Sequence, residues 1–151
     1  MASNRELDPD ECRNRLESQS GGVGRLAIMT PTGPMIYPVN FAVDGNAVVF
    51  RTSRHSLLGS CTWGVDVAFE VDHVDLDARQ GWSVVIKGCA HIVDNPEDED
   101  RLRSLGREPT PWADGLRRMY IRIPYREISG RVVGADWLAN PRPLAHSWFG
   151  Y

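Results

Sequence analysis

Val65-Asp66-Val67-Ala68-Phe69-Glu70-Val71-Asp72 alternates apolar residues with small or acidic ones. Successive side chains of a β-strand point to opposite faces of a sheet, so this pattern predicts a strand with one buried and one solvated face. Half-buried strands of this kind are typical of antiparallel sheets, in which one face packs on the core. The stretch therefore predicts a fold built on antiparallel strands.

The same period of two recurs upstream, on both sides of a turn signal. Residues 35–43 alternate in this way, and residues 48–52 form a second strand-like run. Between them stands Asp44-Gly45-Asn46, a composition that favours a tight hairpin. Further strands are expected at residues 25–29, 82–93 and 119–123, and residues 128–133 are expected to continue the last of these.

Two helices are expected beside the strands. Asp8 is a good N-cap, Pro9 suits the first helical position and Glu11 completes a capping box, so a helix should run to about Gln19. Asn95-Pro96-Glu97-Asp98 repeats the start signal, and Gly106 supplies a stop. Short strands with hairpin turns and few helices predict a mainly β (α+β) fold, a six-stranded antiparallel barrel with peripheral helices.

Composition limits the classes of function. The 151 residues fit one domain, residues 1–151, and the net charge of −3 argues against a generic nucleic-acid binder. No apolar run is long enough to span a bilayer, and the first residues lack the apolar core of a signal peptide. Cys12, Cys61 and Cys89 are widely spaced, which argues against a disulfide framework and favours a cytoplasmic protein.

No motif in the sequence indicates a metal site or a catalytic nucleophile. The four histidines have no paired spacing, and no Gly-x-Ser-x-Gly motif occurs. We therefore expect no metal and name no catalytic residue.

Tyr37-Pro38-Val39-Asn40-Phe41 is the first candidate binding segment. Proline cannot donate to a sheet ladder, so Pro38 predicts an edge, a bulge or an interrupted pairing. Neighbouring backbone groups and the Asn40 amide could then bind the amide-like edge of a planar heterocycle. An ordinary edge strand is the alternative interpretation.

The second candidate segment is Arg51-Thr52-Ser53-Arg54-His55-Ser56, at the end of a predicted strand. Guanidinium cations and short hydroxyl donors together suit a phosphate monoester. A solvated loop with scattered charges is the alternative.

Further along the chain, Trp82-Ser83 places a large aromatic residue beside a hydroxyl at the start of another strand, although tryptophan is more often a core residue.

Taken in order, these segments resemble the pyridoxamine 5′-phosphate oxidase-like superfamily of flavin-binding split β-barrels. Within it, the chain is most similar to the small bacterial branch related to nitroimidazole-resistance proteins. The resemblance covers residues 15–135 and rests on Gly24-Arg25-Leu26-Ala27, Pro38-Val39-Asn40-Phe41, Val49-Phe50-Arg51-Thr52, Val67-Ala68-Phe69-Glu70-Val71-Asp72, Gly81-Trp82-Ser83-Val84, Gly88-Cys89-Ala90, Pro111-Trp112-Ala113 and Ile128-Ser129-Gly130-Arg131.

The resemblance implies a homodimer of six-stranded antiparallel split β-barrels with FMN at the interface. The implied cofactor residues are Pro38, Val39, Asn40, Arg51, Thr52, Ser53, Arg54, Ser56, Trp82 and Ser83. The implied activity is that of an oxidoreductase acting on a small molecule, with reduced nicotinamide as the electron donor.

One position departs from the family pattern. Many relatives carry a phosphate-binding lysine where this chain has Leu57, and Arg54 and His55 are the candidate replacements. Two alternatives therefore stay open: a deazaflavin-dependent reductase, or a non-catalytic barrel that binds flavin or haem. The C-terminal tail, residues 136–151, contains Trp148, Phe149 and Tyr151, which suggest docking on the barrel or on the partner subunit.

Overall fold

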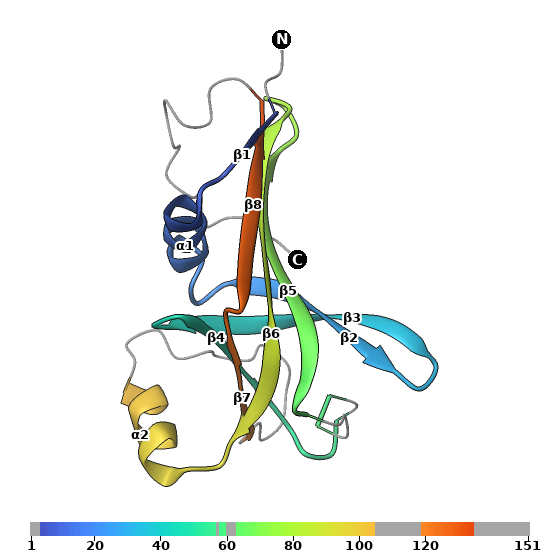
Figure 1. Cartoon of the computed structure of the whole chain (residues 1–151), viewed down its shortest axis with the longest axis vertical. Helices are drawn as coiled ribbons and strands as arrows, with labels where there is room; N and C mark the ends of the chain where they lie inside the picture. The colour runs from blue at the N-terminus through green and yellow to red at the C-terminus, as the bar shows by residue number, and fades with distance from the viewer. Residues whose placement is uncertain (1–3, 57, 60–62, 105–118, 135–151) are drawn as a thin grey trace.

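The computed structural model describes residues 4–56, 58–59, 63–104 and 119–134 (Figure 1). These residues form eight strands and two helices. In chain order the elements are β1 (Asn4–Glu6), α1 (Pro9–Ser18), β2 (Val23–Thr30), β3 (Gly33–Asp44), β4 (Ala47–Thr52), β5 (Val65–Asp75), β6 (Gln80–Val93), α2 (Pro96–Ser104), β7 (Met119–Pro124) and β8 (Glu127–Val133).

Six of the strands close into a barrel. The sheet runs in the order β1-β8-β6-β5-β2-β3-β4-β7, and an additional β6–β7 pairing joins β7 back to β6. All the pairings are antiparallel. The predicted six-stranded antiparallel barrel with peripheral helices is thus confirmed, and β8 and β1 extend the sheet beyond it (Figure 1).

Strand β6 belongs to both parts of the sheet. Its segment Gly81–Lys87 pairs with β8, and His91–Val93 pairs with β7. Gly88 lies where β6 changes partner, and a Cβ atom there would stand 2.0 Å from the carbonyl oxygen of Pro124. Only glycine lets the two backbones approach so closely.

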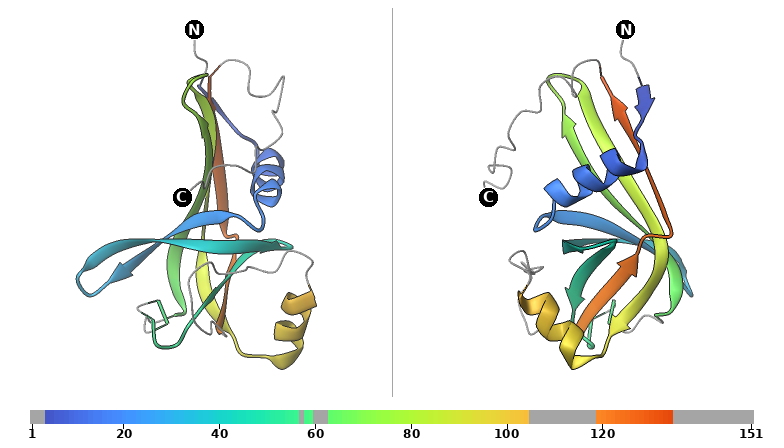
Figure 2. Two further views of the ribbon diagram at one scale, coloured as in Figure 1. Left: turned by 180° about the vertical axis from the view of Figure 1, so that it is seen from behind. Right: turned by 60° about the vertical axis from the view of Figure 1, so that its left-hand side comes forward.

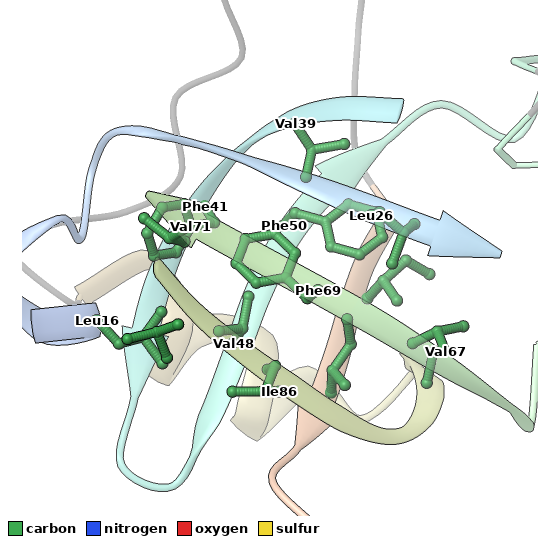
Figure 3. Close-up of a cluster of buried hydrophobic side chains, with 14 of the residues drawn as sticks. Leu16, Leu26, Val39, Phe41, Val48, Phe50, Val67, Phe69, Val71 and Ile86 are labelled. Atoms are coloured by element: carbon green, nitrogen blue, oxygen red, sulfur yellow. The ribbon is translucent and has the colours of Figure 1, made fainter. Parts of the chain in front are cut away.

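The barrel interior is filled by the apolar residues that the alternation predicted. Val67, Phe69 and Val71 of β5 are buried, whereas Glu70 and Asp72 lie on the outer face. Phe69 packs edge-on against Phe41 of β3, with the ring centroids 5.1 Å apart. Figure 3 shows these side chains converging inside the barrel. Because side chains fill the interior, a cofactor must bind outside it.

Helix α1 covers one face of the extended sheet (Figure 2). Asp8 caps it and forms the predicted capping box with Glu11. Cys12 and Leu16 of α1 are buried in the main core. The opposite face of the β5–β6–β8 sheet carries the outward-pointing residues.

Helix α2 lies at the other end of the molecule, beside β4 and β7 (Figure 2). Its buried Leu102 packs with Val49 and Tyr120. Arg101 of α2 forms an ion pair with the nearly buried Asp44 of β3, which also accepts a hydrogen bond from Arg122 at 3.2 Å. These two arginines hold the pKa of the Asp44 carboxyl below its ordinary value.

Two features of the strand prediction need correction. Residues 128–133 do not continue β7: they lie in β8, which pairs with the first half of β6 and with β1. The chain leaves β7 at Pro124, and the backbone N–H groups of Tyr125 and Arg126 bond to carbonyls of other segments. The short strand β1 was not predicted. No helix in the described ranges is long and apolar enough to cross a membrane.

Candidate functional site

Strand β3 changes its pairing partner in the middle of the first candidate segment. Residues Gly33–Asn40 pair with β2, and Phe41–Asp44 pair with β4. The last pair between β3 and β4 is Phe41–Phe50, so Asn40 and Arg51 are the first residues beyond it, where the two strands separate. The interrupted pairing that Pro38 predicted is therefore present.

The residues of this segment point alternately inward and outward. Val39 belongs to the buried core, while Pro38 on the outer face lies opposite Arg25 of β2. Alternation places Asn40 on the same outer face as Pro38. Of the three predicted residues, Pro38 thus lies on the outer surface and Val39 supports it from inside, while the Nδ2 atom of Asn40 is buried.

The second candidate segment forms a compact turn, called the β4 turn below (Thr52–Ser56 with Gly59). Ser56 Oγ lies at its centre: it donates to the Ser53 carbonyl at 2.7 Å and accepts from the Gly59 N–H at 3.0 Å. The buried Thr52 Oγ1 lies 2.8 Å from Ser56 Oγ. These hydroxyls bond to one another and to backbone, so they shape the turn instead of projecting into solvent.

Gly59 closes the β4 turn. A Cβ atom at this position would stand 1.8 Å from the Ser53 carbonyl oxygen. The Ser53 hydroxyl accepts a hydrogen bond from the His55 N–H at 3.2 Å. Internal hydrogen bonds and the close approach at Gly59 therefore define the shape of the turn.

Two cations flank the β4 turn. The guanidinium carbon of Arg51 lies 5.2 Å from the centroid of the Tyr120 ring on β7. The exposed Arg54 forms no ion pair with any carboxylate of the described residues. Arg54 thus stands beside the turn without a carboxylate partner among the described residues, and a guanidinium beside short hydroxyls is a combination that suits a phosphate monoester. The departure at Leu57 lies outside the described residues.

Trp82 and Ser83 lie on opposite faces of β6. Trp82 is 4% exposed and packs in the core beneath α1, where Arg15 stacks over its ring at 5.3 Å. Ser83 lies on the outer face, opposite Asp72 of β5 and Arg131 of β8. Three strand spacings separate β6 from β3, about 14 Å. The structure therefore does not gather the predicted residues into one cluster.

A charged cluster lies between these two groups on the outer face. Arg25 Nη1 is 2.9 Å from Asp72 Oδ1 and 3.2 Å from Glu70 Oε2. Partial burial, together with the charge of Asp72, raises the pKa of the Glu70 carboxyl. The cluster carries one excess negative charge and links β2 to β5.

A pocket of about 310 Å³ lies at the end of the β5–β6–β8 sheet, beside Ser83. Val74, Leu76 and Val133 supply exposed apolar surface there, and Arg79 and Arg131 supply two guanidinium groups. Sequence reasoning missed both arginines as site residues. Register would have revealed Arg131, because it pairs with Ser83, but the register of β8 could not be read from local pattern.

The comparisons with known proteins agree with this architecture. The family model described as pyridoxamine 5′-phosphate oxidase matches residues 8–132. The uncharacterized protein Rv0080 of Mycobacterium tuberculosis is 33% identical over 136 residues, which cover 87% of this chain and 86% of that protein. The FAD binding protein of Mycobacterium smegmatis has 30% identity and a TM-score of 0.74, covering 87% of this chain and 99% of that one.

A more distant structure shares the fold of the predicted branch. A Bacteroides thetaiotaomicron protein, provisionally described as a 5-nitroimidazole antibiotic resistance protein, has 13% identity and a TM-score of 0.66, covering 89% of this chain and 90% of that one. The family model covers most of the chain, and its match includes both candidate segments. This chain belongs to the pyridoxamine 5′-phosphate oxidase family.

Proposed function

We propose that this protein is a homodimeric, FMN-binding oxidoreductase that reduces a small molecule with electrons from reduced nicotinamide. The observation that carries the proposal is the separation of β3 from β4 at Asn40 and Arg51. It lies directly beside the β4 turn and Arg54, which pairs with no carboxylate of the described residues. Bound flavin would supply hydride-transfer chemistry, and the chain's own residues bind and orient it.

The β4 turn fits a phosphate group in charge and in shape. Arg54 offers a fixed fork of N–H donors with no competing carboxylate among the described residues. The turn is held by the Thr52, Ser56 and Gly59 contacts, so binding would not have to order it. In this arrangement Arg54 binds the anion, while Thr52 and Ser56 hold the backbone in position.

The outer face of β3 fits the ring system. Its Gly33–Asn40 half has no pairing to β4, and the flat ring of Pro38 is exposed there, beside the Asn40 amide, whose Nδ2 atom is buried. Arg25, cross-strand from Pro38, is held by Glu70 and Asp72. Its charge is offset there by these two carboxylates, so its role is to hold the outer face of β2 against β5.

Exposed apolar side chains on β3 support a second subunit. Ile36 is 67% exposed and Met35 is 40% exposed, on the strand half that carries Pro38. A flavin on this face would stay in contact with water unless another surface covered it. Ser83 lies too far along the sheet to join the same cluster, so a partner's Ser83 face is the natural cover.

FAD is the second candidate cofactor. It is favoured by the Mycobacterium smegmatis relative, which is named as an FAD binding protein and covers 87% of this chain. FMN and FAD share the ring and the first phosphate, so the same β4 turn would serve both.

The deazaflavin alternative has the weaker support, because it depends on Arg117, Arg118 and Arg122. Arg117 and Arg118 lie outside the described residues, and Arg122 binds Asp44.

The first test is an absorption spectrum of the purified protein, followed by chromatographic identification of any released chromophore. We expect a flavin spectrum, and we expect Arg54→Met to weaken flavin binding by tenfold or more, the scale of a lost charged hydrogen bond. Arg13→Met is the matched control, because Arg13 is an exposed arginine on α1 that pairs only with Asp10 among the described carboxylates.

Three results would overturn parts of the proposal. A colourless protein that binds neither FMN nor FAD removes the flavin assignment, and binding of a deazaflavin instead identifies the alternative cofactor. Flavin binding with no oxidation of reduced nicotinamide in the presence of several acceptors favours the non-catalytic reading. If the protein is a monomer at the concentrations of the assay, the proposal that two subunits together form the flavin site is wrong.

A further inference from the structure

We propose that the pocket beside Ser83 binds a small apolar molecule carrying one carboxylate, with Arg79 and Arg131 as the residues that hold the anion. Its role as the acceptor site of the oxidoreductase rests on the function proposed above. The binding chemistry itself follows from the pocket's shape, apolar surface and charge.

The size and surface of the pocket suit an organic ligand. Its volume of about 310 Å³ lies at the lower end of ligand sites, enough for a molecule of one or two rings. Leu76 is 74% exposed, Val74 is 51% exposed and Val133 is 40% exposed, although all three line the same hollow. Apolar residues gathered at an open pocket indicate a binding site better than the same residues scattered singly would.

The two guanidinium groups of the pocket can bind a negatively charged group. Neither Arg79 nor Arg131 forms an ion pair within the part of the chain that the structure describes. The two carboxylates that line the pocket are already engaged: Asp72 binds Arg25 at 2.9 Å, and Asp75 accepts the Ala78 N–H at 2.9 Å. Arg25 is shared between Asp72 and Glu70, so the formal charges of Arg79, Arg131 and Asp75 and those of this charged cluster balance.

That charge balance favours a monoanion over a dianion. A carboxylate would pair with the planar fork of either arginine. A phosphate dianion would meet stronger repulsion from Asp75 and Asp72 than a carboxylate would, and no excess positive charge is present to offset its second negative charge. The site therefore fits an aromatic or aliphatic monocarboxylate better than a phosphate ester.

The backbone at Arg79 supports the same assignment. Arg79 has a φ of 51°, whereas every other positive φ in the described ranges belongs to glycine. A left-handed turn position favours glycine, so an arginine there carries a cost in backbone conformation. The position of its side chain at the pocket is consistent with a binding role that offsets this cost.

The location links the pocket to the proposed reaction. Arg131 pairs directly with Ser83 on the outer face, and Ser83 is one of the predicted flavin residues. A ligand held by Arg131 would thus lie next to a flavin that contacts Ser83. A carboxylate that also carries a reducible double bond could take up a hydride from a reduced flavin and a proton from water across that bond, which would leave the flavin oxidised.

The test measures binding of 1-naphthoate to the full-length protein as purified, by calorimetry and without nicotinamide. We expect naphthoate to bind at least tenfold more tightly than 1-naphthalenemethanol, which has a similar ring but no charge. Arg131→Met should lower naphthoate affinity by tenfold or more, and Arg79→Gly should lower it while leaving the fold intact. Arg103→Met, an exposed arginine on α2, should leave it unchanged.

Flavin retention, measured in parallel, separates this inference from the proposed function. Wild-type protein that retains flavin but binds naphthoate no better than the alcohol overturns the inference alone. Naphthoate binding that depends on Arg131 in a protein that binds no flavin supports the pocket and overturns the oxidoreductase. Equal losses in Arg131→Met and Arg103→Met would show general charge attraction and would also overturn the site.

Discussion

The β4 turn and the pocket beside Ser83 are both polar surface regions, but their polar groups are used differently. In the β4 turn, Thr52 and Ser56 bond to each other and to backbone, and Gly59 fits only because it has no side chain. At the pocket, Arg79 and Arg131 stay unpaired with described carboxylates beside exposed Leu76. In the first region the polar side chains are hydrogen-bonded internally, whereas in the second the two guanidinium groups have no ion-pair partner among the described residues.

The largest expected effect comes from Gly59→Ala in the β4 turn. The new Cβ would meet the Ser53 carbonyl oxygen at 1.8 Å, so the backbone must move. We expect a loss of about 3 kcal/mol in the free energy of unfolding, at the upper end of overpacking effects, together with loss of flavin retention. Denaturant unfolding of this variant and of His55→Ala, an exposed change in the same turn, provides the measurement. Equal effects of the two changes would mean that the turn is not rigid.

The second largest effect is expected at Asp44, which holds α2 to the barrel through its ion pair with Arg101. Asp44→Asn removes the charge that pairs with Arg101 and Arg122, and we expect a loss of about 2 kcal/mol at pH 7. Asp66→Asn is the control, because its pair with Arg126 is exposed and should be worth less than about 0.5 kcal/mol.

The Asp44 contribution should also depend on pH. Its folded pKa lies below its ordinary value, so the stabilisation is complete above about pH 4, the unfolded value, and disappears as the pH falls through the folded pKa. Thermal unfolding of wild type and Asp44→Asn should therefore converge in acid. Parallel curves down to low pH would show that the ion pair contributes nothing.

A smaller effect tests whether the hydroxyls of the β4 turn are structural. Thr52→Val keeps the shape but removes the bond to Ser56, and we expect a loss of about 1 kcal/mol in unfolding free energy. Thr32→Val, an exposed change at the β2–β3 hairpin, is the control. If Thr52→Val abolished flavin binding without changing stability, the hydroxyl would serve the ligand directly, and the contrast with the pocket would be weaker.

The smallest effect has the opposite sign. Arg79→Gly relieves a left-handed backbone position, and we expect the protein to gain about 0.5–1 kcal/mol in stability. A rise in Tm together with weaker naphthoate binding would show that Arg79 lowers the stability of the protein but strengthens ligand binding. A fall in Tm would mean that Arg79 supports the fold, and the difference between the two regions would then be smaller than described.

Much of the fold was predictable because the chain marks its elements locally. The capping box at Asp8 and the turn at Gly45, whose φ is 58°, both occur where the residues indicate them. Period-two alternation also predicts that Trp82 and Ser83 face opposite sides. The end of β7 at Pro124 was missed because the apolar pattern resumes so soon afterwards, and only long-range pairing shows that β8 belongs to another part of the sheet.

The candidate site was less predictable, for a physical reason. The β4 turn is contiguous in sequence, so its residues could be named in advance. The pocket takes side chains from β5, β6, β8 and the intervening turn, and their proximity depends on register. The positive φ of Arg79 has no signal in its residue type, since glycine or asparagine is expected there.

The alternation along β6 constrains how this family member could change during evolution. Inserting one residue directly after Gly81, with no β-bulge to absorb it, would turn Trp82, Val84 and Ile86 outward and bring Ser83 and Lys87 into the core. Length changes in this strand must therefore come in pairs of residues or be absorbed by a β-bulge. The turn between β5 and β6 is free of that restriction, so it is the place where lineages can acquire new ligand preferences without rebuilding the barrel.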